Sequence, residues 1–120
     1  MILEALNSAI SGVCNTYPMV GDIEATMPFA VYNVMQNVLR DKSGIVGYQY
    51  DVSISVVDPD IDTCMTKSSG IKVAIDALED TTVQDTTFDI VHFISEAQRY
   101  DAVAFNYIND MEFSITTQNI

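Results

Sequence analysis

Residues 48–58 read YQYDVSISVVD, and this stretch decides the fold of the chain. Apolar and polar residues alternate strictly along it as far as Val56. Because successive side chains of a β-strand point to opposite faces of a sheet, this period of two predicts a strand with one face in the core. Its tyrosines and β-branched residues also favour a strand. The predicted core face is Tyr48, Tyr50, Val52, Ile54 and Val56, and the predicted outer face is Gln49, Asp51, Ser53 and Ser55.

A second predicted strand, Phe29–Leu39, lies just before this stretch and is apolar on both faces. Such a strand is typical either of the centre of a sheet or of a contact between subunits. The connecting segment Arg40–Gly44 is charged and ends in a glycine, which accepts the positive φ angles of tight turns. We therefore predict a long antiparallel hairpin over residues 29–58, with a charged tip.

Two helices are predicted on either side of this hairpin. Apolar residues recur every three or four positions in Ile2–Asn15 and again from Ile61 to Leu78, as in amphipathic helices. A loop is expected over Thr16–Pro28, which contains three of the chain's proline and glycine residues. The segment Asp58–Asp60 ends the strand and caps the second helix, because acidic side chains stabilise a helix N-terminus. Gly70, inside that helix, is predicted to mark a close approach of another element.

The C-terminal part reads as two further strands, Phe88–Tyr100 and Val103–Thr116. A bulge is a possible feature at Asn109-Asp110, although the alternation runs through it. The expected fold is therefore a single α+β domain over residues 1–120. It has two layers, with an antiparallel sheet of about four strands, formed by two hairpins, and two helices packed on one face.

The composition restricts the functions that the chain can have. Its 120 residues include 17 acidic and 5 basic ones, giving a net charge of −12. Such a surface repels phosphate groups, which disfavours nucleic-acid binding through a basic patch and docking on anionic membranes. No run of 18 apolar residues predicts a membrane span. The charge serves either solubility or a second purpose, the passage of a polyanion without adhesion.

No catalytic, cofactor or metal motif occurs in the sequence, and we expect neither an enzyme nor a cofactor. Asp58, Asp60 and Asp62 have the spacing of a calcium loop, but its required glycine and glutamate are missing, so a helix cap is the preferred explanation. His92, the single histidine, is expected to be a partly buried strand residue. Cys14 and Cys64 are expected to be buried free thiols in predicted helices, with one disulfide as the alternative.

The pattern as a whole resembles a family of virion proteins. The stretches that carry the resemblance are TYPMVGDIEATMPFAVYNV from residue 16, YQYDVSISVVDPD from 48, DTCMTKSSGIKVAIDAL from 62 and SEAQRYDAVAFNYINDMEFSITTQ from 95. In their order and residue patterns these stretches resemble the tail-completion or tail-terminator proteins of long-tailed bacteriophages and prophages, which join head and tail. The resemblance covers the chain from Met1 to about Gln118.

This resemblance implies a structural protein of the virion tail or neck, assembled in the host cytoplasm. Members usually form a hexameric ring that caps the tail tube, stops tube polymerisation and offers a surface for head attachment. The implied partners are further copies of the chain, the tail-tube protein and the head–tail connector protein, and DNA passes through without specific binding. A head–tail connector or neck protein of similar size is the first alternative, and a monomeric acidic module that binds a ligand or protein is the second.

Two sets of residues follow as candidates for such a role. The first set would contact neighbouring subunits, because it combines apolar positions of the two-faced strand with cations at the hairpin tip: Val31, Met35, Arg40 and Lys42. The second set would face outward or toward a channel, because it lies on the polar side of the central strand: Gln49, Asp51 and Ser53.

Overall fold

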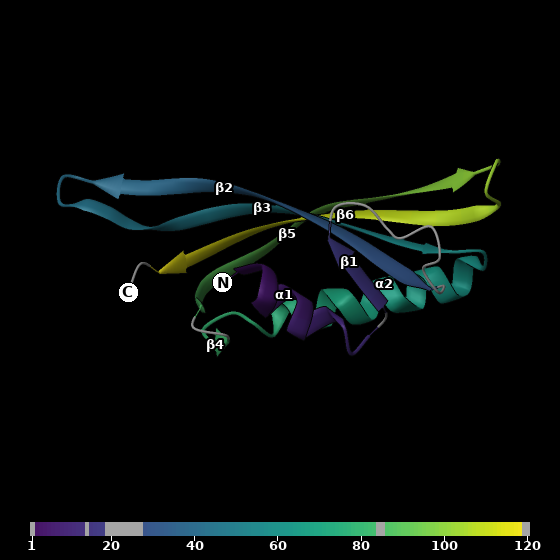
Figure 1. Ribbon diagram of the computed structural model, residues 1–120, viewed down its shortest axis with the longest axis horizontal. Coiled ribbons are helices and arrows are strands. Elements are labelled where there is room, and N and C mark those ends of the chain that lie inside the picture. The colour runs from purple at the N-terminus through teal and green to yellow at the C-terminus, as the bar shows by residue number, and fades with distance from the viewer. Residues whose placement is uncertain (1, 14, 19–27, 84–85, 119–120) are drawn as a thin grey trace.

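The computed structural model describes residues 2–13, 15–18, 28–83 and 86–118 of the chain. These residues form two helices and six strands, which alternate along the chain as helix, three strands, helix and three strands (Figure 1). The elements are α1 (Ile2–Ile10), β1 (Asn15–Pro18), β2 (Phe29–Asp41), β3 (Gly44–Asp58), α2 (Ile61–Asp76), β4 (Thr82–Val83), β5 (Thr86–Asp101) and β6 (Asn106–Gln118).

The expected sheet of about four antiparallel strands is wrong in both number and direction. The described residues form a six-stranded sheet in the order β1-β2-β3-β6-β5-β4, and β1 runs parallel to β2. The two predicted hairpins are its centre, joined through the antiparallel pair β3–β6. The two additional strands at its edges, β1 and β4, are too short to show a period in sequence. The fold is α+β in the broad sense.

The hairpin β2–β3 forms as predicted and is long enough to extend beyond the helices (Figure 1). Its strands pair from Phe29 opposite Val57 to Asp41 opposite Gly44. Gly44 has a φ of +120°, a value that residues with a Cβ rarely adopt, so the glycine is required there. The carboxylate of Asp41 accepts a 2.7 Å hydrogen bond from the Ser43 amide and closes the turn.

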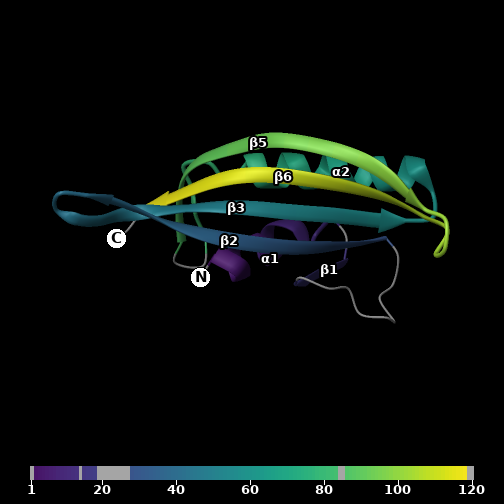
Figure 2. The same cartoon turned by 90° about the horizontal axis from the view of Figure 1, so that it is seen from above.

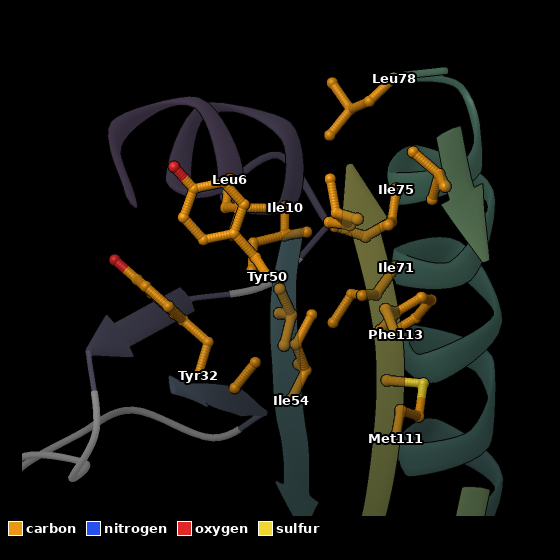
Figure 3. Close-up of a cluster of buried hydrophobic side chains, with 14 of the residues drawn as sticks. Leu6, Ile10, Tyr32, Tyr50, Ile54, Ile71, Ile75, Leu78, Met111 and Phe113 are labelled. Atoms are coloured by element: carbon orange, nitrogen blue, oxygen red, sulfur yellow. The ribbon is translucent and has the colours of Figure 1, made fainter. Parts of the chain in front are cut away.

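Both helices lie on one face of the curved sheet and form the core with it (Figures 1 and 2). β3 lies at the centre of this packing, since its side chains contact residues from each layer (Figure 3). The principal extents of the molecule are 52 × 22 × 22 Å, so the core occupies a rod-like body. The largest side chains buried there include Leu6 and Ile10 of α1, Ile54 of β3, Ile71 and Ile75 of α2, Phe88 of β5, and Met111 and Ile115 of β6.

α2 begins where the sequence predicts. Asp60 is its N-cap, and its carboxylate accepts hydrogen bonds from the Thr63 amide at 3.3 Å and the Thr63 hydroxyl at 2.8 Å. These bonds lower the pKa of Asp60, with the one from the hydroxyl contributing most. The preceding Asp58 is buried and accepts a 2.8 Å hydrogen bond from the Asp60 amide. The carboxylates thus begin a helix, as expected.

Gly70 marks a close approach, which confirms the prediction from its place in α2. A Cβ atom at this position would lie 2.8 Å from Cγ1 of Val13, which follows α1. Real Cβ atoms essentially never come that close to another heavy atom. The absence of a side chain at Gly70 therefore lets the segment after α1 lie against α2.

The predicted strand Phe88–Tyr100 forms within β5, but two bulges change which of its residues face the core. The register shifts between Phe88 and Ile90 and again between Phe93 and Ser95, whereas β6 pairs without a shift through Asn109 and Asp110. Each bulge adds one residue and reverses the faces of those that follow. His92 is consequently exposed beside Ser114 rather than partly buried.

The remaining boundaries differ by a few residues. α1 ends at Ile10 rather than at Asn15, which is instead the first residue of β1. β6 begins at Asn106 rather than at Val103, because residues 102–105 form the turn and Phe105 there has a φ of 58°. Cys64 is a buried free thiol whose pKa is raised, mainly by that burial. Cys14 lies outside the described residues.

Candidate interaction surface

In the described part of the chain, no helix covers the second face of the sheet, here called the open face (Figures 1 and 2). The residues of the open face alternate with core residues along the four long strands β2, β3, β6 and β5, except at the bulges. Its residues include Val31, Asn33, Met35 and Asn37 of β2; Gln49, Asp51, Ser53 and Ser55 of β3; Asp110, Glu112, Ser114 and Thr116 of β6; and Ile90, His92, Ser95, Ala97 and Arg99 of β5.

Side-chain amides connect three strands across the open face. The Asn37 amide donates to Oε1 of Gln49 at 2.8 Å. The Gln49 amide in turn donates to Oδ1 of Asp51 at 2.8 Å and to the Ser114 hydroxyl at 2.9 Å. Asn37 lies opposite Gln49, Ser114 lies diagonal to it, and Asp51 follows two residues later on the same strand, so the pairing of the strands positions this network.

A second polar group lies further along the same face. Asp110 accepts hydrogen bonds from the Ser55 hydroxyl at 2.6 Å and from Nε of Arg99 at 2.8 Å. Burial alone would raise the pKa of Asp110, but the bonds from Arg99 and Ser55 and the charge of Arg99 together lower it. The carboxylate is therefore ionised at neutral pH.

The open face carries more negative than positive charge. Asp51, Asp110 and Glu112 lie on it with Arg99, and Arg99 is already paired with Asp110. The amides and hydroxyls between these carboxylates are neutral. The surface is thus polar and moderately acidic, and Arg99 on it is engaged by Asp110 rather than free to bind a phosphate.

The structure places the sequence-predicted site residues in two locations. Gln49, Asp51 and Ser53 lie on the open face, and so do Val31 and Met35, opposite Ser55 and Asp51. The two apolar members of the first set are therefore neighbours of the second set on one surface. Met35 is 59% exposed, so β2 presents apolar area beside the polar network.

The predicted cations Arg40 and Lys42 lie apart from this surface, at the tip of the hairpin β2–β3. Both are exposed, and neither forms an ion pair with a described residue. Val38 and Leu39, close to the tip, are also exposed hydrophobic residues. The tip of the hairpin β2–β3 thus combines two exposed cations with exposed apolar side chains.

Sequence reasoning missed a partly buried polar cluster on the helix side of β5. Glu96 accepts bonds from Nζ of Lys72 and from the amide of the fully buried Asn109, each at 3.0 Å. The Gln98 amide donates to Oδ1 of Asn109, also at 3.0 Å. The bonds from Asn109 and then Lys72 lower the pKa of Glu96. The two bulges cancel, so Glu96 lies on the same face as Phe88, as plain alternation would place it. Its partners Lys72 and Asn109 come from α2 and β6, and no local pattern in the sequence pairs them with it.

Beside this cluster, α2 and β5 enclose a shallow hollow lined by Lys72, Val73, Asp76 and Phe93. Nζ of Lys72 lies 5.3 Å from the centre of the Phe93 ring, and the ring meets Phe113 edge-on at 5.5 Å. These contacts involve groups already engaged with one another. The hollow therefore has few polar groups free to hold a small ligand.

The described residues provide neither a cluster of metal ligands nor a membrane-spanning helix. They contain no group of three or more His, Cys, Asp or Glu side chains placed to hold a metal ion. Neither described helix combines the length and the apolar character needed to cross a bilayer.

Comparison with known proteins gives a structural similarity. A chain of the virion of a native gene transfer agent (GTA) particle superimposes with a TM-score of 0.69, covering 95% of this chain and 84% of that one. The two sequences are 17% identical over this match. No protein-family model matches the chain, and no curated protein is similar to it in sequence. The chain therefore shares the fold of a protein found in that virion.

Proposed function

We propose that this chain is a structural protein of a virion, and that it acts as a tail terminator. In this role, several copies, six by the resemblance in sequence order, form a ring on the end of the tail tube. The ring stops tube polymerisation and offers the surface to which the head attaches. The role requires no catalysis and no cofactor.

The observation that carries this proposal is the shared fold. The similarity to the chain from the gene transfer agent virion covers 95% of this chain, so it includes both hairpins and both helices. The resemblance to tail-terminator proteins rests on different information, the residues and their order along the sequence. The two lines of support agree on a virion component.

The charge of the open face supports a place beside DNA. A ring that turns this face toward its channel would line the channel with Asp51, Asp110 and Glu112 among neutral amides and hydroxyls. Such a lining repels phosphates, so a duplex passes without being trapped. The net charge of −12 acts in the same direction at longer range.

Electron microscopy of the purified chain, alone and mixed with the tail-tube protein from the same genome, tests the proposal. We expect rings with a central channel, or tubes capped at one end by an additional ring. Binding to the portal-side neck proteins but not to tubes would instead indicate a head–tail connector. A protein that stays monomeric and binds neither partner would contradict both roles.

The channel has its own test. Replacing Asp51, Asp110 and Glu112 together by the corresponding amides should leave the ring intact but allow it to retain DNA in a filter-binding assay at low salt. The unmodified ring should not retain DNA under the same conditions. Equal retention by both proteins would show that the open face does not line the channel.

A further inference from the structure

In the described part of the chain, both long outer strands of the sheet have an uncovered edge (Figure 2). β1 pairs with β2 only along Phe29–Tyr32, and β4 pairs with β5 only at Thr86 and Thr87. Past these points each outer strand has a described strand neighbour on one side alone. Amide and carbonyl groups along such an edge are available to pair with another strand.

The edge of β2 lacks the features that normally prevent such pairing. Its segment Asn33–Leu39 reads NVMQNVL, with no charge and no proline, and pairs regularly with β3. The bulge in this strand comes only afterwards, between Leu39 and Arg40. Protected edges carry inward-pointing charges, prolines or bulges, and this segment has none of these.

In the first half of β5, bulges protect the edge from pairing with another strand. In the second half, the strand pairs regularly with β6 and its edge is unprotected. Both bulges precede Ser95, and Ser95–Asp101 pairs with β6 without a shift. Two of the charges in this regular segment are already paired, Glu96 with Lys72 and Arg99 with Asp110. An approaching strand therefore meets little free charge there. The regular segment is as long as Asn33–Leu39.

The direction of the strands favours pairing between β5 and β2 of different copies. The four long strands alternate in direction across the sheet, so β2 and β5 run opposite ways. When a rotation axis relates two copies, β5 of one can lie antiparallel to β2 of the next. Such a contact uses two different edges, so it repeats from copy to copy, and it forms a closed ring when the rotation between copies divides a full turn.

We propose that Asn33–Leu39 of one copy pairs antiparallel with Ser95–Asp101 of the next and thereby forms the subunit contact of the ring. The pairing places Gln36 opposite Gln98. On the open face, Asn37 then lies opposite Ala97, and on the helix side Val34 lies opposite Tyr100. Tyr100 is an exposed hydrophobic residue in the single chain. Inner residues meet inner ones throughout, so a single sheet continues across the contact.

The inference rests on the proposed ring, and disulfide cross-linking tests it separately. The protein carries Asn37→Cys and Ala97→Cys in a background with Cys14→Ser, while the native Cys64 is buried and does not compete. Directly opposed residues of an antiparallel pair lie within reach of a disulfide. Copper phenanthroline oxidation should therefore give a ladder of covalent oligomers on a non-reducing gel. An equimolar mixture of the two single variants should give dimers only.

Two controls fix the partner and the register. Asn37→Cys alone should stay monomeric; covalent dimers from it would mean that β2 pairs with β2, which overturns the inference. His92→Cys combined with Asn37→Cys should give no ladder, since His92 lies beyond the paired segment, several residues from the position opposite Asn37. A ladder from that pair as the main product would overturn the proposed register.

The outcome also separates this inference from the proposed function. Rings or capped tubes in the microscope without any bond between positions 37 and 97 would overturn the edge pairing and leave the terminator role intact. A ladder without binding to tubes would support the edge pairing and contradict the terminator role. Absence of both rings and bonds would contradict the two together.

Discussion

The two faces of the sheet are held in place by different interactions. The covered face packs Val52, Ile54 and Val56 against two helices, and all three side chains are at most 1% exposed. The open face carries Ser53 and Ser55 between those same residues, and hydrogen bonds connect its side chains. One stretch of sequence thus supplies both a hydrophobic core and a polar surface.

The difference shows which face can accept a new function at little cost. Burial of an apolar side chain contributes about 1.5–3 kcal/mol to stability, whereas an exposed polar pair contributes about 1 kcal/mol or less. Substitutions on the open face are therefore nearly free of folding penalties. That face can adapt to a partner or a channel while the covered face keeps the fold.

The largest expected effect tests this contrast directly. Ile54→Ala removes buried methyl groups from the centre of the core, and we expect it to lower the free energy of unfolding by about 3 kcal/mol. The neighbouring Ser53→Ala should change it by less than about 0.5 kcal/mol, because the side chain is exposed. Urea denaturation followed by circular dichroism measures both. Similar losses for the two variants would refute the contrast.

A charge on the covered face gives the next largest effect. Glu96→Gln leaves Lys72 without its partner carboxylate and should cost about 1–2 kcal/mol near neutral pH. Folding lowers the pKa of Glu96 below its value in the unfolded chain. Its contribution is therefore fully present above that value and is lost as pH falls through the folded-state pKa.

The pH dependence of unfolding provides the check. The stability difference between the original protein and Glu96→Gln should shrink as the pH is lowered from 7 toward the folded-state pKa. Glu112→Gln on the open face is the matched control, since Glu112 is exposed and forms no ion pair with a described residue. A difference for Glu96→Gln that stays constant with pH would contradict the proposed role of the ion pair.

The contact between α2 and the segment after α1 predicts a smaller effect on stability. The sign of this effect should depend on the residue at position 13. Gly70→Ala should destabilise the protein by about 1 kcal/mol in total. Overpacking against Val13 costs about 2 kcal/mol, and the higher helix propensity of alanine returns about 1 kcal/mol of this. With Val13→Ala already present, the same change should be neutral or stabilising. Thermal unfolding of the four proteins in this cycle measures the coupling. Additive effects would show that the two positions do not interact.

The smallest effect belongs to an ion pair on the open face. Arg99→Gln removes the exposed partner of Asp110 and should cost less than about 1 kcal/mol, decreasing as salt screens the pair. Denaturation at about 0.05 M and at about 1 M NaCl, below and above physiological ionic strength, shows how much of the cost salt screens. A cost that is large or independent of salt would place Arg99 among the residues essential for the fold.

The strands and helices were predictable from sequence because their periods are long and regular. Tyr48–Asp58 and its partner strand form the predicted hairpin, and Asp60 caps α2 as expected. β1 and β4 were not predictable, since they are short and exist through their pairing with β2 and β5. The bulges of β5 were missed for a related reason: they depend on how the strand fits β6 and α2, which no local pattern records.

The candidate surface was predictable in part. Alternation alone places Gln49, Asp51 and Ser53 on one side of β3. It does not show that Val31 and Met35 share that side, because this follows from the register of two strands. Glu96 lies on the face that alternation from Phe88 gives it, since the two bulges cancel, but its partners Lys72 and Asn109 come from α2 and β6, so its role required the three-dimensional structure.

The most direct test of the proposed function is the length of tails made without this chain. Removing its gene from the genome that encodes it, and examining the particles by electron microscopy, shows whether tube growth still stops. We predict tails of uncontrolled length that lack heads, with normal particles restored by supplying the chain in trans. Tails of normal length joined to heads in its absence would contradict the role as a terminator.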